Sequence, residues 1–302
     1  GAFRMTDCGI NPNYSVKFFR PGVYKVVKFK NGLRLHVPER RGEGESTPNA
    51  EKLSQSLTRA KSVVTQIAIC NEWQYFFTGT LSPQKVNRYD LSVWKSMSQW
   101  LRDQNKKYHT HVKYLILPEK HENGAWHFHG LLSGVPARWV SEFVPGFHPQ
   151  YLIDKGFLNW PAFEKKWGYC SLGEVRSNIG VSLYITKYIT KDVARNVTAL
   201  GAHVYYASIG LKRAVPLGYA YGSVPYFDSV ASHDSQYCST GFVFDGKWSN
   251  FIPYLSGGVE ALPPLDWEEE VPCITNVEPP DMAALQLSLF ELYSEQQGRG
   301  SK

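Results

Sequence analysis

Two apolar runs joined by an Asn-Gly pair constrain the fold of this chain more than any other feature. The runs are VKYLILPE (112–119) and WHFHGLLSG (126–134), and Asn123-Gly124 lies between them. Asn-Gly between strand-forming segments is the strongest short signal for a tight hairpin turn. Parallel strands would need a much longer crossover. The sequence therefore predicts an antiparallel β-hairpin.

Strands and helices alternate around this hairpin. Further strands are predicted at 74–82, near 150–153 and at 168–175. Helices are predicted at 48–70, 90–104, near 138–145, near 160–167 and from Ile179 through SLYITKYITKDVA. Two short alternating runs around Asn31-Gly32 predict a second hairpin near the N-terminus. This order favours an α+β fold with an antiparallel sheet and helices packed on one face.

Charge is unevenly distributed along the 302 residues, whose net charge is +6. Residues 259–302 contain nine acidic and two basic residues, which leaves 31 basic and 18 acidic residues in 1–258, a net charge of +13. A basic body favours a polyanionic partner, although a solvated face explains charge equally well. Composition divides the chain into a basic segment with a hairpin, a central domain, a Gly/Tyr-rich extension and an acidic Pro-rich tail, at 1–50, 51–215, 216–258 and 259–302.

Several classes of protein are disfavoured by the sequence. No apolar run approaches the ~18 residues of a membrane helix, so no membrane partner is expected. Five cysteines without CxxC spacing are typical of free thiols in a reducing compartment. The expected location is cytoplasmic, in the bacterial host cytoplasm if a phage encodes the chain. A helix at 281–293 with Met282, Leu285 and Leu289 on one side is a candidate docking segment.

His127-Phe128-His129 is the first candidate site. Residues i and i+2 of a strand share a face, so both imidazoles project together while Phe128 points to the other side. Glu119 ends the paired strand and is brought beside them by the hairpin. Two imidazoles and a carboxylate suit Mg²⁺ or Mn²⁺ and accept Zn²⁺. Glu122 is an alternative ligand in the turn, and two separately hydrogen-bonded structural histidines are the alternative to a metal site.

A second His-x-His triplet, His109-Thr110-His111, lacks these features. Its middle residue is polar, it follows the polar run QNKKY, and no acid is paired with it. These features are typical of surface histidines.

The second candidate site is YITKYITK (184–191). In a helix, Tyr184 and Tyr188 lie one above the other, with Lys187 and Lys191 in a neighbouring column. A tyrosine is a nucleophile only where cations or a metal-bound phosphate lower the cost of ionisation. An amphipathic helix with interfacial tyrosines and solvated lysines is the alternative. Combined with a metal site, the pair predicts attack on a DNA phosphate, giving a 5′-phosphotyrosine and a free 3′-hydroxyl.

These motifs resemble those of a known superfamily. FFTGTLS, the His-hydrophobic-His triplet and YITKYITKD, in this order, are similar to the three motifs of HUH rolling-circle replication initiators. The paired tyrosines resemble the version in replication initiators of single-stranded DNA phages of the microvirus type. Similar chains also carry a helix like RAKSVVTQIAICNEW before the first motif. The resemblance covers about residues 55–195.

The resemblance implies a fold, a substrate and residue roles. The implied fold is a four- or five-stranded antiparallel sheet of ferredoxin-like or RRM-like type. The implied metal ligands are His127, His129 and Glu119, the implied nucleophiles are Tyr184 and Tyr188, and the implied phosphate-positioning lysines are Lys187 and Lys191. The implied substrate is a replication origin exposed as single-stranded DNA. Gly79 departs from the larger apolar residue usual in relatives and predicts a bulge or a close backbone approach.

Other functions remain open or are disfavoured. The run GFVFDGKW (241–248) fits G-x-x-x-x-G-K but lacks the following Ser or Thr, so no nucleotide cofactor is expected and a host helicase is the expected partner. Trp73, Trp126 and Trp167 are candidates for stacking on bases, although abundant large aromatics more often form core. The alternatives to a nicking enzyme are a non-catalytic single-stranded nucleic-acid-binding module and a transposase or relaxase of the same superfamily.

Overall fold

The chain forms two compact units. The computed structural model describes residues 13–31, 50–190, 193–194, 196–197, 203–224, 227, 231, 233–234, 238–244 and 255–256. One unit comprises residues 1–47 and 212–273, and the other comprises residues 48–211 and 274–302. The predicted central hairpin lies in the second, larger unit.

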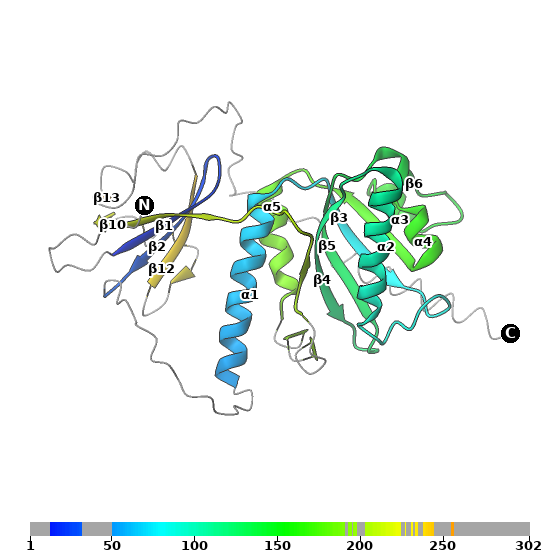
Figure 1. The fold of residues 1–302 in the computed structure, drawn as a ribbon, viewed down its shortest axis with the longest axis horizontal. Coiled ribbons are helices and arrows are strands. Elements are labelled where there is room, and N and C mark those ends of the chain that lie inside the picture. The colour runs from blue at the N-terminus through cyan, green and yellow to red at the C-terminus, as the bar shows by residue number, and fades with distance from the viewer. Residues whose placement is uncertain are drawn as a thin grey trace. The chain divides into compact units, whose positions relative to one another are not determined.

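The larger unit is built on a seven-stranded antiparallel sheet in the order β6-β7-β8-β3-β5-β4-β9 (Figure 1). The strands are β3 (Tyr75–Leu81), β4 (Lys113–Lys120), β5 (Trp126–Ser133), β6 (Ser141–Glu142), β7 (Leu158–Asn159), β8 (Gly168–Glu174) and β9 (Tyr206–Ala207). Four of these are long and lie side by side, whereas β6, β7 and β9 have two residues each. The predicted α+β class with an antiparallel sheet is confirmed.

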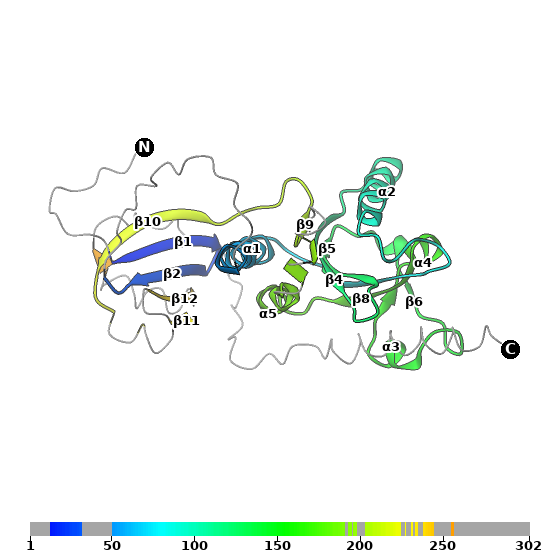
Figure 2. The ribbon, with the colours of Figure 1, turned by 90° about the horizontal axis from the view of Figure 1, so that it is seen from below.

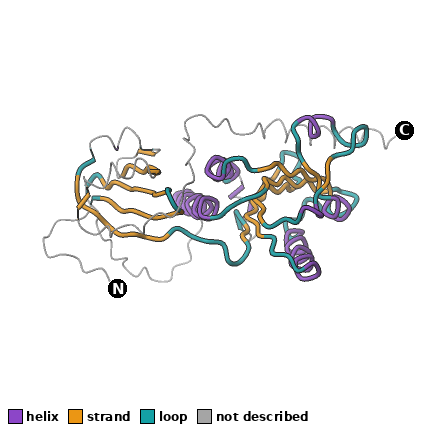
Figure 3. The backbone as a smooth tube through the Cα atoms, turned by 90° about the horizontal axis from the view of Figure 1, so that it is seen from above, coloured by secondary structure: helices purple, strands orange, loops and turns teal. Residues whose placement is uncertain are grey.

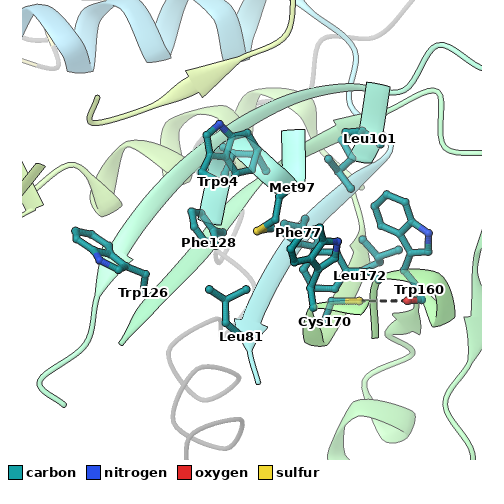
Figure 4. Packing of buried hydrophobic residues seen from close by; sticks show 14 of the residues in the cluster. Phe77, Leu81, Trp94, Met97, Leu101, Trp126, Phe128, Trp160, Cys170 and Leu172 are labelled. Atoms are coloured by element: carbon teal, nitrogen blue, oxygen red, sulfur yellow. Dashed lines mark hydrogen bonds between the residues drawn. The ribbon is translucent and has the colours of Figure 1, made fainter. Parts of the chain in front are cut away.

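Helices cover both faces of this sheet rather than the single face predicted (Figure 3). The helices are α1 (Ala50–Cys70), α2 (Val93–Tyr108), α3 (Gln150–Asp154), α4 (Pro161–Lys166) and α5 (Asn178–Tyr184), with 3₁₀ turns η1 (Ala137–Trp139) and η2 (Ile185–Tyr188). On one face, Trp94 and Met97 of α2 pack with Phe77 and Phe128 (Figure 4). On the other face, α1, α5 and η2 pack against Leu117 and neighbouring strand residues.

Coverage on both faces explains the sequence of β3. Every residue of this strand, YFFTGTL, is buried, as in a strand with no solvated side. Gly79 fits a close approach and not a bulge, because its strand pairs with both neighbours without a register shift. A Cβ atom there would lie 2.7 Å from Cζ of Phe77 and 3.2 Å from Cζ of Phe163.

The smaller unit holds a six-stranded sheet in the order β11-β12-β2-β1-β10-β13. The strands are β1 (Tyr14–Arg20), β2 (Val23–Phe29), β10 (Val215–Gly222), β11 (His233–Asp234), β12 (Cys238–Phe244) and β13 (Leu255–Ser256). Figure 2 shows β1 and β2 between β10 and β12. Its core contains Tyr14, Val16, Tyr24, Val26 and Phe227.

The N-terminal hairpin does not turn where the sequence predicts. Its turn lies at Pro21-Gly22, where Gly22 has a φ of 75° that glycine adopts without a steric cost. Asn31 follows β2, and Gly32 lies outside the described residues. Pro-Gly therefore specifies this turn instead of Asn-Gly.

Three other local predictions are wrong. Residues 150–153 belong to helix α3 rather than a strand, and the stretch predicted as a helix near 138–145 holds η1 and β6. Short apolar runs fit a buried strand and a buried helix equally well, which explains the first error. The helix predicted from Ile179 onwards is α-helical only to Tyr184 and continues as η2.

Some predictions concern residues that lie outside the described part. These are the acidic tail at 259–302, its helix at 281–293 and the Gly246-Lys247 pair. The interior FVF of that Gly-Lys run lies in strand β12, as expected. Among the residues that the structure describes, no helix has the length and apolar character needed to cross a bilayer.

Candidate active site

The β4–β5 hairpin aligns the predicted acid with the predicted histidines. Glu119 is the cross-strand partner of His127, and Leu117 is the partner of His129. The turn closes as predicted, with Gly124 at a φ of 82°. This register places the carboxylate and both imidazoles on one face of the sheet.

Each histidine is held from one side by a threonine of β3. Thr78 is paired with His129 and Thr80 with His127. The distance from Thr78 Oγ1 to His129 Nδ1 is 3.4 Å, and that from Thr80 Oγ1 to His127 Nδ1 is 3.2 Å. All four side chains are at most 5% exposed. The threonines therefore orient each ring through Nδ1, and Nε2 lies on the other side of the ring.

The Nε2 atom of His129 meets Glu119. It lies 2.8 Å from Oε2 of the carboxylate, and Nε2 of a third histidine, His121, lies 3.7 Å from the same oxygen. The His121 ring stacks on His127 with centroids 3.6 Å apart and an interplanar angle of 16°. Three imidazoles and one carboxylate therefore form a continuous chain of contacts.

Burial favours the neutral form of two of these imidazoles. The pKa of His127 is held well below its usual value, mainly by burial and then by the nearby His121, His129 and Arg88. Burial also lowers the pKa of His121, opposed by the charge of Glu119. Neutral imidazoles keep the lone pairs that a metal or a proton would use.

Tyr188 lies directly against the histidine strand. Its ring stacks on His129 with centroids 4.0 Å apart and an interplanar angle of 12°. The side chain is 3% exposed, and its hydroxyl has no hydrogen-bond partner among the described residues. Burial, followed by the neighbouring Tyr184, raises the pKa of Tyr188 above its usual value. The phenol is thus held in its neutral form beside the imidazoles.

Tyr184 occupies a different environment, which the sequence did not predict. The chain narrows to a 3₁₀ turn after Tyr184, and residues i and i+3 eclipse one another in such a turn. Lys187 is therefore aligned with Tyr184: its Nζ donates to the Tyr184 hydroxyl and lies 3.6 Å from the ring centroid. The same Nζ lies 5.2 Å from the ring centroid of Tyr188. Lys191 lies outside the described residues.

The site offers donors that suit a divalent cation, but they do not converge. Among the described residues, no group of three or more His, Cys, Asp or Glu side chains is arranged around a common point for a metal ion. The donor types and the Nδ1 contacts to threonine hydroxyls do fit one, because metal-ligating histidines are usually anchored through their second ring nitrogen. A cation would have to replace the direct contact between Glu119 and His129.

The structure separates the other predicted residues from this cluster. His109 and His111 are exposed, and His109 ends α2 in the left-handed region at a φ of 53°. Glu122 is exposed in the turn. Trp73, Trp126 and Trp167 are at most 5% exposed, as core residues are, so none presents a ring to a base.

His121 is the residue that sequence reasoning missed. It was assigned to the turn, yet its backbone N–H bonds the carbonyl of Ala125 and continues the hairpin. The signal was present, because His121 is two residues from Glu119 and therefore shares its face. The predicted turn hid a fourth polar group of the cluster.

Comparison with known proteins agrees with this cluster. A family model described as Replication-associated protein, of the ORF2 type, matches residues 74–193, which is less than half of the chain. The match supports a rolling-circle replication initiator. The matched range contains every site residue predicted from the sequence. No curated protein and no solved structure matches the chain.

Proposed function

We propose that the larger unit is an HUH-type endonuclease that nicks and rejoins single-stranded DNA at a replication origin. The observation that carries this proposal is the contact of the tyrosine segment with the histidine strand, through the stack of Tyr188 on His129. Two phenols, a lysine, histidines and a carboxylate are then available to one phosphate. These groups are the ones that a tyrosine transesterification needs.

In the proposed reaction, a phenol oxygen of Tyr184 or Tyr188 attacks phosphorus and the bond to the 3′ oxygen breaks. The phenol proton ends on the released 3′ oxygen, so the products are a 5′-phosphotyrosine and a 3′-hydroxyl. Lys187 stabilises the Tyr184 phenolate, since its ammonium already contacts that hydroxyl. Reversal of the same step with a second 3′-hydroxyl joins the strands.

His127, His129 and Glu119 would hold the divalent cation, Mg²⁺ or Mn²⁺, and His121 is placed to add a further donor. Such a cation, when bound, supplies positive charge to the phosphate oxygens. The threonines of β3 orient the imidazoles toward it. Lys191 as a phosphate-positioning residue, a host helicase as partner and a microvirus origin remain predictions from the sequence.

The test is formation of an SDS-resistant adduct between the full chain and a circular single-stranded DNA of phage type. We expect an adduct with Mn²⁺, loss of the adduct in EDTA, and no adduct for the Tyr184→Phe/Tyr188→Phe double variant. A DNA substrate that carries terminal hairpins or a conjugative origin distinguishes a transposase or relaxase.

A second candidate function is single-stranded nucleic-acid binding without chemistry. It is favoured by the donors that do not converge on one point among the described residues. This function gives binding that persists in EDTA and in the double tyrosine variant, with no adduct under any condition.

A further inference from the structure

The sheet of the smaller unit has one face that its core does not use. Tyr14, Val16, Tyr24 and Val26 point into the core. Alternation sends Lys17, Lys25 and their neighbours to the opposite face. The chemistry of that opposite face is unlike that of a core.

Two lysines oppose each other at its centre. Lys17 of β1 and Lys25 of β2 are direct cross-strand partners, and both are half-buried. Like charges directly opposite in an antiparallel pair are destabilising. Burial and the charge of Lys17 lower the pKa of Lys25 from its usual value. An anion placed between the two ammonium groups would relieve this repulsion.

Acidic residues do not relieve it within the described sheet. Strands β1, β2, β10 and β12 contain no Asp or Glu. Asp234 of β11 is the acid closest in the sheet order, and it is engaged by Lys30 at 2.7 Å and by the Ser239 hydroxyl. The described part of this face therefore carries positive charge only.

Aromatic rings flank the lysine pair. Phe242 of β12 is the cross-strand partner of Lys25, whose Nζ lies 6.0 Å from the ring centroid, and Phe19 packs edge-on against Phe242. Tyr219 of β10 is 43% exposed in the next row, opposite Ser15. Cations that alternate with rings on an open sheet are the features that bind phosphates and stack unpaired bases.

We infer that this face, defined by Lys17, Lys25, Tyr219 and Phe242, binds single-stranded DNA independently of the tyrosine site. The lysine pair takes backbone phosphates, and the rings take base faces. A duplex hides those faces, so the surface selects single strands. The inference adds a second DNA contact to the protein and does not require that the larger unit performs any chemistry.

The test measures binding of a fluorescent 20-nucleotide oligothymidine to the full chain in EDTA, which removes the metal and offers no origin sequence. The variant is Lys17→Gln/Lys25→Gln. The charge-matched control is Lys106→Gln/Lys107→Gln, at the exposed end of α2. We expect about tenfold weaker binding for the first variant at low salt. Its slope of log affinity against log salt should fall by about 1.4, because two phosphate contacts are lost at ~0.7 each. The control should change neither quantity as much.

Two further measurements separate this result from unfolding. Removal of the repelling pair should leave the thermal midpoint of the DNA-free protein unchanged or raise it. Tyr219→Ala should weaken binding by about fivefold or more through lost stacking, without a change in the salt slope. Unchanged affinity and slope in the lysine variant, an equal loss in the control, or equally tight binding of a 20-base-pair duplex would each overturn the inference. Adduct formation by the lysine variant at saturating DNA tests the tyrosine site separately.

Discussion

The two faces of the seven-stranded sheet are built from the same strands and bury opposite chemistry. On one face, Phe77 and Phe128 meet the tryptophans and methionine of α2. On the other, Thr78 and His129, their direct neighbours in the chain, are buried just as deeply. Apolar burial stabilises a fold, whereas buried polar groups cost free energy unless they are paired. The comparison indicates that one face supplies stability and the other supplies function.

Truncation on the apolar face should produce the largest loss of stability. Phe128 is fully buried, with its ring centroid 5.6 Å from that of Trp94. Phe128→Ala should lower the free energy of unfolding by about 3–5 kcal/mol, measured by urea denaturation. The adduct yield per folded molecule should stay near that of the parent chain. A loss below about 1 kcal/mol would contradict the assigned role of this face.

Substitution on the polar face should have the reverse signature. His127→Gln and His129→Gln should each reduce the rate of adduct formation by about 100-fold or more, the scale of a lost electrostatic group in an active site. Circular dichroism and the urea midpoint should show a folded protein. His111→Gln is the matched control, since that histidine is exposed and remote from the cluster. Full activity in both strand variants would remove the histidines from the site.

The threonines of β3 should have a smaller effect of the same kind. Thr78→Val and Thr80→Val keep the side-chain shape and remove the hydroxyl contacts to Nδ1. Groups that orient ligands typically contribute about 10- to 100-fold to metal affinity or activity. We expect the concentration of Mn²⁺ needed for half-maximal adduct formation to rise by that order. An unchanged Mn²⁺ requirement would show that the threonines serve the fold alone.

The smallest effect should appear in the pH dependence of stability. His127 has a pKa held well below its usual value of 6.5 by burial and neighbouring positive groups. The unfolded chain therefore binds more protons than the folded chain as the pH falls below about 6.5. Stability that is complete above that pH should decline below it, by at most about 1.4 kcal/mol per pH unit for this group. His127→Gln should flatten the profile of thermal midpoint against pH between about 7 and 5, and an identical profile would contradict the assignment.

The sequence predicted the local frame of the site better than its surroundings. Asn123-Gly124 set the hairpin register, so the pairing of Glu119 with His127 followed from spacing alone. The threonine contacts were not predicted, because the pairing of β3 with β5 joins residues far apart in the chain. The same limit hid the six-stranded sheet, in which β1 near the N-terminus pairs with β10 beyond the larger unit.

The tyrosine pair shows a different limit. Helical periodicity placed Tyr184 and Tyr188 in one column, as the sequence YITKYITK implies. The chain instead tightens to a 3₁₀ turn, which aligns Lys187 with Tyr184 and packs Tyr188 against His129. A change from about 3.6 to about 3.0 residues per turn leaves no clear mark in composition. Geometry of this kind has to be observed.

The central claim is that a phenol of this tyrosine pair reacts at the histidine cluster. The most direct measurement is mass spectrometry of the covalent product formed by the full chain with circular single-stranded DNA and Mn²⁺. The account predicts a nucleotide linked through its 5′ phosphate to the peptide that contains Tyr184 and Tyr188, at one of these two phenols. Linkage to any other residue, or no covalent product where the DNA is demonstrably bound, would contradict it.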